Sequence, residues 1–231
     1  MLPSYEEFQL QADAVRSRIA RACALAHRDP GEVELLAVTK SHPAAAAELA
    51  ARYGLRAVGE NRVQEGVDKR AQTSAAVAWE LIGHLQSNKA RLAVLHFDRI
   101  QSVDSARLLG ILDRIAGEAG KTQAVLLQVN AGLDPAKSGV EPDDAPRLLA
   151  AALACKNIRV DGLMTIAPLT DSPDGARRTF ANLRAIRDRL ASDAGARLAE
   201  LSMGMSGDLE AAVAEGSTIV RIGTALFGSR A

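Results

Sequence analysis

The stretch ELLAVTKSHP, residues 34–43, contains the pattern on which the fold is built. Leu35 to Val38 are apolar and predict a buried strand, and Pro43 suits the first position of a following helix. Lys40 lies between them, where the strand is expected to end. A lysine at such a place usually extends to water, so a role in binding or chemistry needs further support.

The same rhythm of strand and helix continues along the chain. Short apolar or β-branched runs predict eight strands, at residues 34–39, 55–58, 79–83, 99–103, 123–129, 158–164, 198–202 and 218–222. Predicted helices lie between them, at residues 43–53, 62–76, 88–95, 105–118, 143–154, 174–192 and 207–215. Such alternation implies a parallel sheet, and its size matches a (β/α)8 TIM-type barrel. A doubly wound open sheet is the alternative, but no G-x-G-x-x-G follows the first strand.

An extra amphipathic helix precedes this repeat. Ser4 and Glu7 have the spacing of a capping box, and the helical pattern continues to about residue 27, before an Asp-Pro-Gly sequence. No linker or change of composition marks a second domain. The sequence therefore predicts one domain, residues 1–231, with the leading helix in 1–30 and the barrel in 33–228.

The composition excludes several classes of partner. The 231 residues carry 28 Lys and Arg against 28 Asp and Glu, and 3% of them are aromatic, which disfavours binding to nucleic acid. The first residues lack the basic and apolar regions of a signal peptide, and no run has the length that spans a membrane. Cys23 and Cys155 lie far apart without metal-ligand spacing, which predicts reduced thiols, no metal and a cytoplasmic location.

The residues at or just after the ends of the predicted strands, most of them polar, lie at the end of the barrel where such folds place their sites. In chain order they are Lys40, Glu60 with Asn61, His84, Ser102 with Asp104, Asn130, Met164 with Thr165, Ser202 with Met203, and Gly223 with Thr224. Lys40 is the obvious nucleophile among them. A ring of polar residues around one end of the barrel predicts a binding site.

The last two strand–helix units predict an anion site within this ring. SMGMSGDLE, residues 202–210, places Gly204, Ser206 and Gly207 at the beginning of a helix, where unpaired amides and the helix dipole favour a negative charge. Gly223 and Thr224 follow strand eight, and barrels often bind phosphate with the loops after strands seven and eight. The alternative is that Ser206 only caps its helix and the glycines only form turns.

Lys40 faces this predicted phosphate site. Arg221 lies on strand eight, the neighbour of strand one in a closed barrel, and a nearby cation and partial burial both lower the pKa of a lysine. More neutral amine is then available for a Schiff base with a carbonyl compound. The ligand expected from the residues is a phosphosugar or pyridoxal 5′-phosphate (PLP).

For four further polar residues the sequence gives less reason to expect a role in the site. Lys89 is expected to face solvent or a neighbouring helix, and Lys137 lies in a long loop after strand five, a place for a lid or a mobile ligand contact. His84 is interpreted as a hydrogen-bonded core histidine. Asp104 is interpreted mainly as a helix cap.

Seven segments together resemble the pyridoxal phosphate homeostasis protein family. They are AVTKSHP, VGENRVQEGVDK, WELIGHLQSNK, SVDS, KSGV, GLMTIAP and LSMGMSGDLEAAVAEGSTIVRIGTALFG, in family order from about residue 33 to 228. The resemblance implies a barrel like the N-terminal domain of alanine racemase, with PLP as an internal aldimine on Lys40. Many members carry a second lysine where this chain has His42, so a role of that lysine in holding PLP is not expected here.

The resemblance also implies the roles of further residues. Asn61 lies near the cofactor, Met164 lines its ring and Arg221 faces the pyridine nitrogen. The phosphate is expected on two loops, one with Ser202, Met205 and Ser206, the other with Gly223 and Thr224.

The chemistry of Arg221 favours a carrier over an enzyme. An arginine stays protonated and leaves the pyridine nitrogen neutral, which makes PLP a poorer electron sink. Racemases of this type use an opposing tyrosine as second base, but Tyr5 and Tyr53 lie in helices away from the strand ends. The sequence therefore predicts a monomeric, non-catalytic protein that buffers PLP or delivers it to apo PLP-dependent enzymes. A weak amino-acid racemase and a Schiff-base aldolase remain the alternatives.

Overall fold

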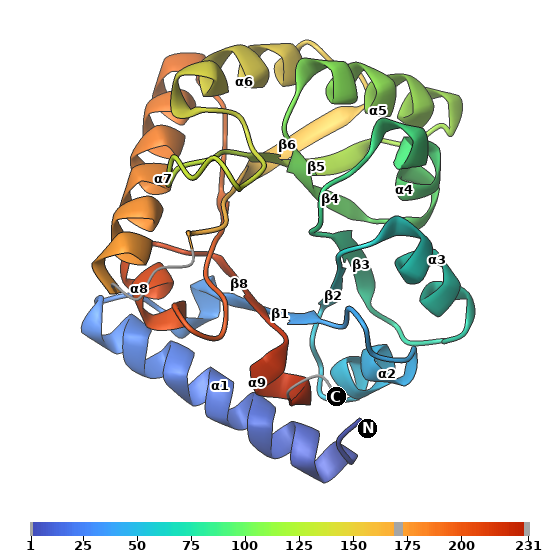
Figure 1. Ribbon diagram of the computed structural model, residues 1–231, viewed down its shortest axis with the longest axis vertical. Coiled ribbons are helices and arrows are strands. Elements are labelled where there is room, and N and C mark those ends of the chain that lie inside the picture. Colours follow the sequence, from blue (N-terminus) through green and yellow to red (C-terminus); the bar gives the residue numbers. More distant parts are fainter. Residues whose placement is uncertain (1, 169–172, 229–231) are drawn as a thin grey trace.

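The computed structural model describes residues 2–168 and 173–228, and in these residues eight parallel strands close into a barrel (Figure 1). The strands are β1 (Glu34–Val38), β2 (Ala57–Glu60), β3 (Ala78–Leu81), β4 (Arg99–Val103), β5 (Gln123–Gln128), β6 (Ile158–Met164), β7 (Glu200–Ser202) and β8 (Ile219–Ile222). Each strand pairs with the next, and β8 returns to β1. The predicted (β/α)8 barrel is confirmed, and the open doubly wound sheet is wrong.

Helices surround the barrel. They are α1 (Tyr5–Leu25), α2 (Ala45–Arg52), α3 (Val63–Ala71), α4 (Ala90–His96), α5 (Ala106–Glu118), α6 (Ala145–Leu153), α7 (Pro173–Ala194), α8 (Leu209–Ala214) and α9 (Thr224–Phe227). Short 3₁₀ turns add η1 (Pro30–Glu32), η2 (Ser87–Lys89) and η3 (Pro142–Asp144). Lys89, at the end of η2, is half-buried before α4.

The predicted extra helix is α1, which lies outside the ring along α8 and α9 (Figure 1). Its first turn has the predicted capping box, because Ser4 accepts from the Glu7 amide while the Glu7 carboxylate accepts from the Ser4 amide. Phe8 is fully buried on its inner face and packs on Phe227 of α9, with ring centroids 5.3 Å apart. The helix is therefore attached to the segment that follows β8.

Several predicted boundaries differ from the structure, among them the end of the helix predicted at 62–76, which stops at Ala71, and for two of them the physical reason is plain. The second strand begins at Ala57, because Leu55 is instead a buried residue that ends α2 by donating a hydrogen bond to Ala50 O. Gly54, with φ +87°, makes the reversal between them. The first helix of the repeat begins at Ala45, so Pro43 precedes it instead of occupying its first position.

The apolar core has two parts. The larger part lies between the strands and the helices, and the smaller lies inside the barrel. The inner cluster consists of Leu36, Val38, Ala57, Ile82, Leu126, Met164 and Ile219. Buried polar side chains, among them Gln101, Ser202 and Arg221, share the interior with this cluster. A barrel interior is usually filled by branched apolar residues, and barrel sites lie at the carboxyl ends of the strands.

Some expectations concern features outside the barrel. Cys23 is buried, Cys155 is half-buried, and both are free thiols. Of the helices described here, none has the length and apolar character needed to cross a membrane. Across residues 2–168 and 173–228, no group of three or more His, Cys, Asp or Glu side chains is placed to bind a metal ion. The division of residues 1–231 into a single domain stays a prediction.

Candidate functional site

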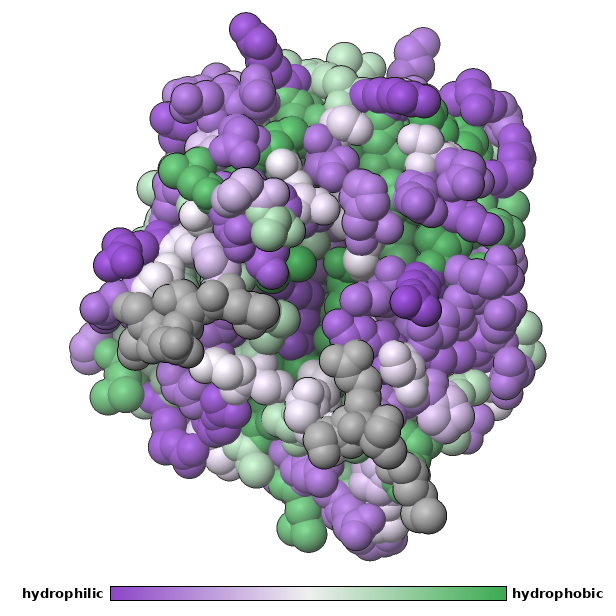
Figure 2. Space-filling model, in the orientation of Figure 1, coloured by the Kyte–Doolittle hydropathy of each residue, from purple (hydrophilic) through white to green (hydrophobic). Residues whose placement is uncertain are grey.

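A cavity of about 480 Å³ lies at the carboxyl ends of the strands. It has the size typical of a small-molecule site. In the space-filling view the molecule is hollowed near its centre, inside the ring of helices (Figure 2). The residues that line the cavity come from the ends of β1, β2, β3, β5, β6, β7 and β8 and from the loops that follow them. They include Lys40, Asn61, Gly83, His84, Gln128, Lys137, Ile166, Met205, Ser206, Gly207, Arg221, Gly223 and Thr224.

Lys40 reaches this cavity from the turn after β1. Thr39 continues the strand, since its amide donates a hydrogen bond of 3.0 Å to Gly59 O on β2. Lys40 is half-buried, and Ser41 after it has φ +63°, a left-handed conformation that is uncommon for a residue other than glycine. The chain therefore turns sharply at Lys40, and the lysine lines the cavity instead of the outer surface.

Arg221 approaches the cavity from below, on β8. Its side chain is 4% exposed, and Nη1 donates to Ser202 Oγ at 2.7 Å while Nη2 donates to Thr165 O at 2.8 Å. Burial lowers the pKa of Arg221 to about 10, and the nearby Asp208 carboxylate opposes that shift. The guanidinium is therefore still protonated at neutral pH and acts only as a hydrogen-bond donor.

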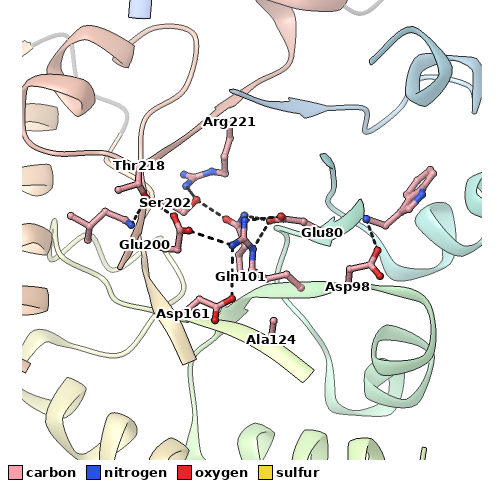
Figure 3. Close-up of polar contacts among 12 residues, drawn as sticks. Glu80, Asp98, Gln101, Ala124, Asp161, Glu200, Ser202, Thr218 and Arg221 are labelled. Carbon is pink, nitrogen blue, oxygen red and sulfur yellow. Dashed lines mark hydrogen bonds and ion pairs between the residues drawn. The ribbon is translucent and has the colours of Figure 1, made fainter. Parts of the chain in front are cut away.

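A chain of hydrogen bonds continues from Arg221 into the barrel (Figure 3). Ser202 Oγ donates to Gln101 Oε1 at 2.6 Å, and Gln101 Nε2 donates to the Glu80 carboxylate. Arg99 donates to the same carboxylate through Nε and Nη2, at 3.0 and 2.7 Å. Arg221 and Arg99 can only donate hydrogen bonds, so Ser202 accepts from Arg221 and donates onward to Gln101, and the Glu80 carboxylate accepts from both Gln101 and Arg99. Sequence reasoning missed Gln101, although a glutamine in the middle of the predicted strand at residues 99–103 was an available signal.

The loop after β7 forms another part of the cavity. Gly204 has φ +94°, and an added Cβ would lie 2.4 Å from Ala212 Cβ, so the loop needs glycine there. Helix α8 begins at Leu209 with Asp208 at the cap position, so the interpretation of Ser206 as a helix cap is wrong. Ser206 and the following glycine line the cavity instead.

Helix α1 supports this loop from outside. Arg18 Nη2 donates to Ser206 O at 3.0 Å, and the same guanidinium forms an ion pair with Glu210 of α8 at 2.7 Å. On the other side of the cavity, Phe227 packs on Phe8 of α1, and the ring centroids of Phe227 and His42 are 5.0 Å apart. The extra helix thus contacts the segments after both β7 and β8.

Asn61 enters the cavity because a glycine lies beside it. An added Cβ on Gly83 would come within 2.1 Å of Asn61 O, a distance that no real Cβ adopts. Gly83 therefore permits the close approach of the chain after β3 to the chain after β2. The sequence analysis did not single out Gly83, since a glycine after a strand also suits an ordinary turn.

Two predicted site residues lie beneath the cavity surface. Met164 is fully buried in the inner apolar cluster, and Ser202 is fully buried under Arg221. The structure brings the other seven together in the cavity lining: Lys40, Asn61, Met205, Ser206, Arg221, Gly223 and Thr224. That these residues bind a ligand stays a prediction.

The interpretations of His84 and Asp104 were wrong. The His84 side chain is 56% exposed and lines the cavity, so it is not a core histidine. Its Nδ1 lies 3.5 Å from Asp104 Oδ2, while Ser105 caps α5 by accepting from the Leu108 amide at 3.3 Å. Lys137 also lines the cavity, as its predicted place in the loop after β5 allows.

Comparison with known proteins identifies several relatives. The family described as alanine racemase, N-terminal domain, matches residues 10–231. The pyridoxal phosphate homeostasis protein of Pseudomonas aeruginosa is 43% identical over 217 residues, which cover 94% of this chain and 93% of that protein. The protein of the same name from Aquifex aeolicus is 40% identical over 217 residues, 94% of this chain and 95% of the relative.

Solved structures agree with these relatives. PipY of Synechococcus elongatus, solved with PLP bound, has a TM-score of 0.82 and 46% identity, and the match covers 91% of this chain and 100% of that one. Alanine racemase of Clostridium difficile has a TM-score of 0.77 at 16% identity, over 97% of this chain and 57% of that one, which is a likeness of fold alone. The resemblance predicted from the sequence is confirmed, and the chain belongs to the pyridoxal phosphate homeostasis protein family.

Proposed function

We propose that this chain binds PLP covalently at Lys40 and takes part in PLP homeostasis as a non-catalytic carrier. One observation carries the proposal: a single cavity combines a lysine, a buried arginine and two loops rich in glycine and hydroxyl groups. These are the groups that the aldehyde, the pyridine nitrogen and the phosphate of PLP each need. The names of the curated relatives and the PLP in the PipY structure support the same assignment.

Lys40 provides the attachment. Lys40 would hold PLP through its side-chain amine, which would condense with the aldehyde of the cofactor and release water. Because the turn after β1 directs Lys40 into the cavity, this amine lies on the same side of the barrel as the two glycine-containing loops. Asn61 borders the same space, and Met164 lies below it.

The loops after β7 and β8 suit the phosphate. Ser206 and Thr224 supply hydroxyl donors, and Gly207 and Gly223 line the cavity without a side chain that would keep an anion from the backbone. Met205 lies in the first of these loops. Ser202 does not line the cavity and acts through Arg221 in this proposal.

Arg221 supports the carrier over the enzyme. Its guanidinium can donate to the ring nitrogen but cannot accept a proton from it, because it stays charged at neutral pH. The ring then withdraws electrons less strongly than a protonated pyridine. The two tyrosines lie outside the cavity, Tyr5 under the guanidinium of Arg52 and Tyr53 donating a hydrogen bond to Asp13.

Absorbance spectroscopy and cofactor transfer test the proposal. The purified chain should gain a visible band with PLP, and Lys40→Ala should abolish the band and the adduct that borohydride reduction makes permanent. The loaded protein should also restore an apo PLP enzyme faster than free PLP at equal concentration. A wild-type chain that gains no band with PLP contradicts the binding, and transfer no faster than free PLP contradicts the delivery.

A second candidate function is amino-acid racemisation at a low rate. The observation that favours it is His84, which lines the same cavity as Lys40 and has Asp104 at 3.5 Å from Nδ1. A histidine with a carboxylate partner can exchange a proton. His84 could therefore act as the second base that the sequence analysis did not find. Deuterium exchange at Cα of alanine in heavy water, lost in both Lys40→Ala and His84→Ala, would favour this function over the carrier.

The proposal includes a cytoplasmic location, a monomeric state and apo PLP-dependent enzymes as recipients. Sedimentation of the loaded protein, alone and mixed with an apo-enzyme, tests the last two. A stable dimer would contradict the predicted monomer.

A further inference from the structure

A buried ionic cluster lies beside the turn that carries Lys40. It consists of Glu60 at the end of β2 with Glu65 and Lys69 of α3, and we refer to it as the Lys69 cluster. Lys69 Nζ donates to Glu60 Oε1 at 2.8 Å and to Glu65 Oε1 at 2.7 Å. Lys69 is 7% exposed and Glu60 is fully buried, so this pair is shielded from water.

The Lys69 cluster contacts the residue before Lys40. Lys69 Nζ donates its third hydrogen bond to Thr39 O at 2.7 Å. The hydroxyl of Thr39 donates in turn to Glu60 Oε1 at 2.6 Å. Both polar groups of Thr39 other than its amide are therefore engaged by the cluster, and the amide is bonded to β2.

The same cluster contacts the residue after Lys40. The Ser41 amide donates to Glu65 Oε1 at 2.5 Å, the oxygen that also accepts from Lys69. Ser41 has the left-handed φ of +63°, a conformation that is unfavourable for a residue other than glycine. The bond to Glu65 compensates for this conformation. The backbone is thus fixed immediately before and immediately after Lys40.

The charges in the cluster have different surroundings. Burial raises the pKa of Glu60, although Lys69 and Thr39 donate hydrogen bonds to it. Burial also opposes ionisation of Glu65, but the hydrogen bonds from Lys69 and Ser41 lower its pKa below the usual value. One ammonium group therefore serves two carboxylates and a carbonyl. A buried pair of this kind often contributes no more stability than apolar residues of the same size. Its contacts on both sides of Lys40 point to a role in positioning.

We infer that Lys69 is a positioning residue for Lys40. By bonding Thr39 directly and Ser41 through Glu65, it fixes the direction in which the Lys40 side chain leaves the backbone. A fixed backbone leaves only the side-chain torsions of Lys40 to be ordered when PLP is attached, which lowers the entropic cost of binding. The inference rests on the proposed attachment of PLP at Lys40 and adds that Lys69 orients the Lys40 side chain.

Lys69→Met tests the inference, with Lys121→Met as the matched control. Both lysines are wholly or partly buried and donate to backbone carbonyls, Lys121 to Val94 O at 2.7 Å and Phe97 O at 3.3 Å. Lys69→Met leaves the buried Glu60 carboxylate without its cation and Lys121→Met leaves two carbonyls without a donor, so both variants are expected to melt at a lower temperature. Only Lys69→Met is expected to change the turn at Lys40.

Two measurements separate positioning from stability. In the protein without PLP, hydrogen exchange at the Ser41 amide should become about tenfold faster in Lys69→Met, since that amide loses its ordered acceptor. In the titration with PLP, the dissociation constant should rise about tenfold, the equivalent of about 1.4 kcal/mol. Lys121→Met should leave both quantities within about twofold of the wild type.

The outcomes are distinguishable. If Lys69→Met folds and keeps wild-type exchange at Ser41 and a wild-type dissociation constant, the inference is wrong. If the wild type forms no PLP adduct, the proposed function fails, while the exchange at Ser41 still reports on the positioning. If Lys69→Met does not fold, Glu65→Ala decides, because it removes the Ser41 acceptor at a partly exposed position. Unchanged exchange and binding in Glu65→Ala would then overturn the inference.

Discussion

Ser202 Oγ accepts a hydrogen bond of 2.7 Å from Arg221 Nη1, and both side chains are buried in the barrel. Since the serine also donates to Gln101, its single hydroxyl hydrogen has one direction. The arginine at the base of the cavity is therefore oriented by residues that no ligand would touch.

Ser202→Ala should destabilise the protein and weaken PLP binding together. The change leaves an Arg221 donor and the Gln101 acceptor unpaired in the interior, which costs about 1 to 3 kcal/mol of unfolding free energy. Urea denaturation measures the stability, and titration with PLP measures the binding. Ser217→Ala is the control, because that buried serine donates to Met203 O at 2.7 Å. Equal effects of both changes on PLP affinity would contradict a role of Ser202 in orienting Arg221.

Arg18→Ala should weaken the phosphate part of the site. The change removes the 3.0 Å bond to Ser206 O and the ion pair with Glu210, so the loop after β7 loses its support from α1. The affinity for PLP should fall several-fold, whereas the affinity for pyridoxal, which has no phosphate, should change little. The control is Arg16→Ala on the same helix, whose guanidinium lies over the Tyr53 ring. An equal loss for both ligands would place the effect outside the phosphate site.

Gly83→Ala should disrupt the cavity. The new Cβ would lie 2.1 Å from Asn61 O, so the backbone of one of the two segments must move. The melting temperature and the affinity for PLP should both fall. In Gly110→Ala, on α5, the added Cβ would meet no described atom within 4 Å, and stability should rise by about 1 kcal/mol from helix propensity. A Gly83→Ala protein with wild-type melting and binding would refute the steric argument.

The contribution of Glu65 to stability should depend on pH. Its pKa in the folded protein lies below its ordinary value of 4.5, so below 4.5 the unfolded state takes up the proton first. The stabilisation is fully present above 4.5 and is lost as the pH falls through the folded pKa. The difference in unfolding free energy between the wild type and Glu65→Gln, measured by urea denaturation from about pH 6 to about pH 3, should shrink at the acidic end. A difference that stays constant across this range would contradict the pairing with Lys69.

The sequence by itself determined the architecture. Alternating apolar runs and helical patterns predict eight strand–helix units, because the periodicity of buried residues is a local property of each segment. A local signal also predicted the capping box at Ser4, which the structure confirms. The site could also be placed from the sequence, because parallel strands bring their carboxyl ends together at one end of the barrel.

Only the tertiary structure decided which polar side chains meet. Ser202 and Gln101 are bonded although 101 residues separate them, and hydrophobic periodicity does not encode the register that joins them. His84 was misread because the sequence does not show how far its loop extends into the cavity. The Lys69 cluster was missed as well: Glu60 was assigned only to the ring of residues at the strand ends, and Glu65 and Lys69 were not singled out. The role of a charged residue can be assigned only when its partners and its burial are known. Its electrostatic energy depends on the distances between elements and on the water that those elements exclude.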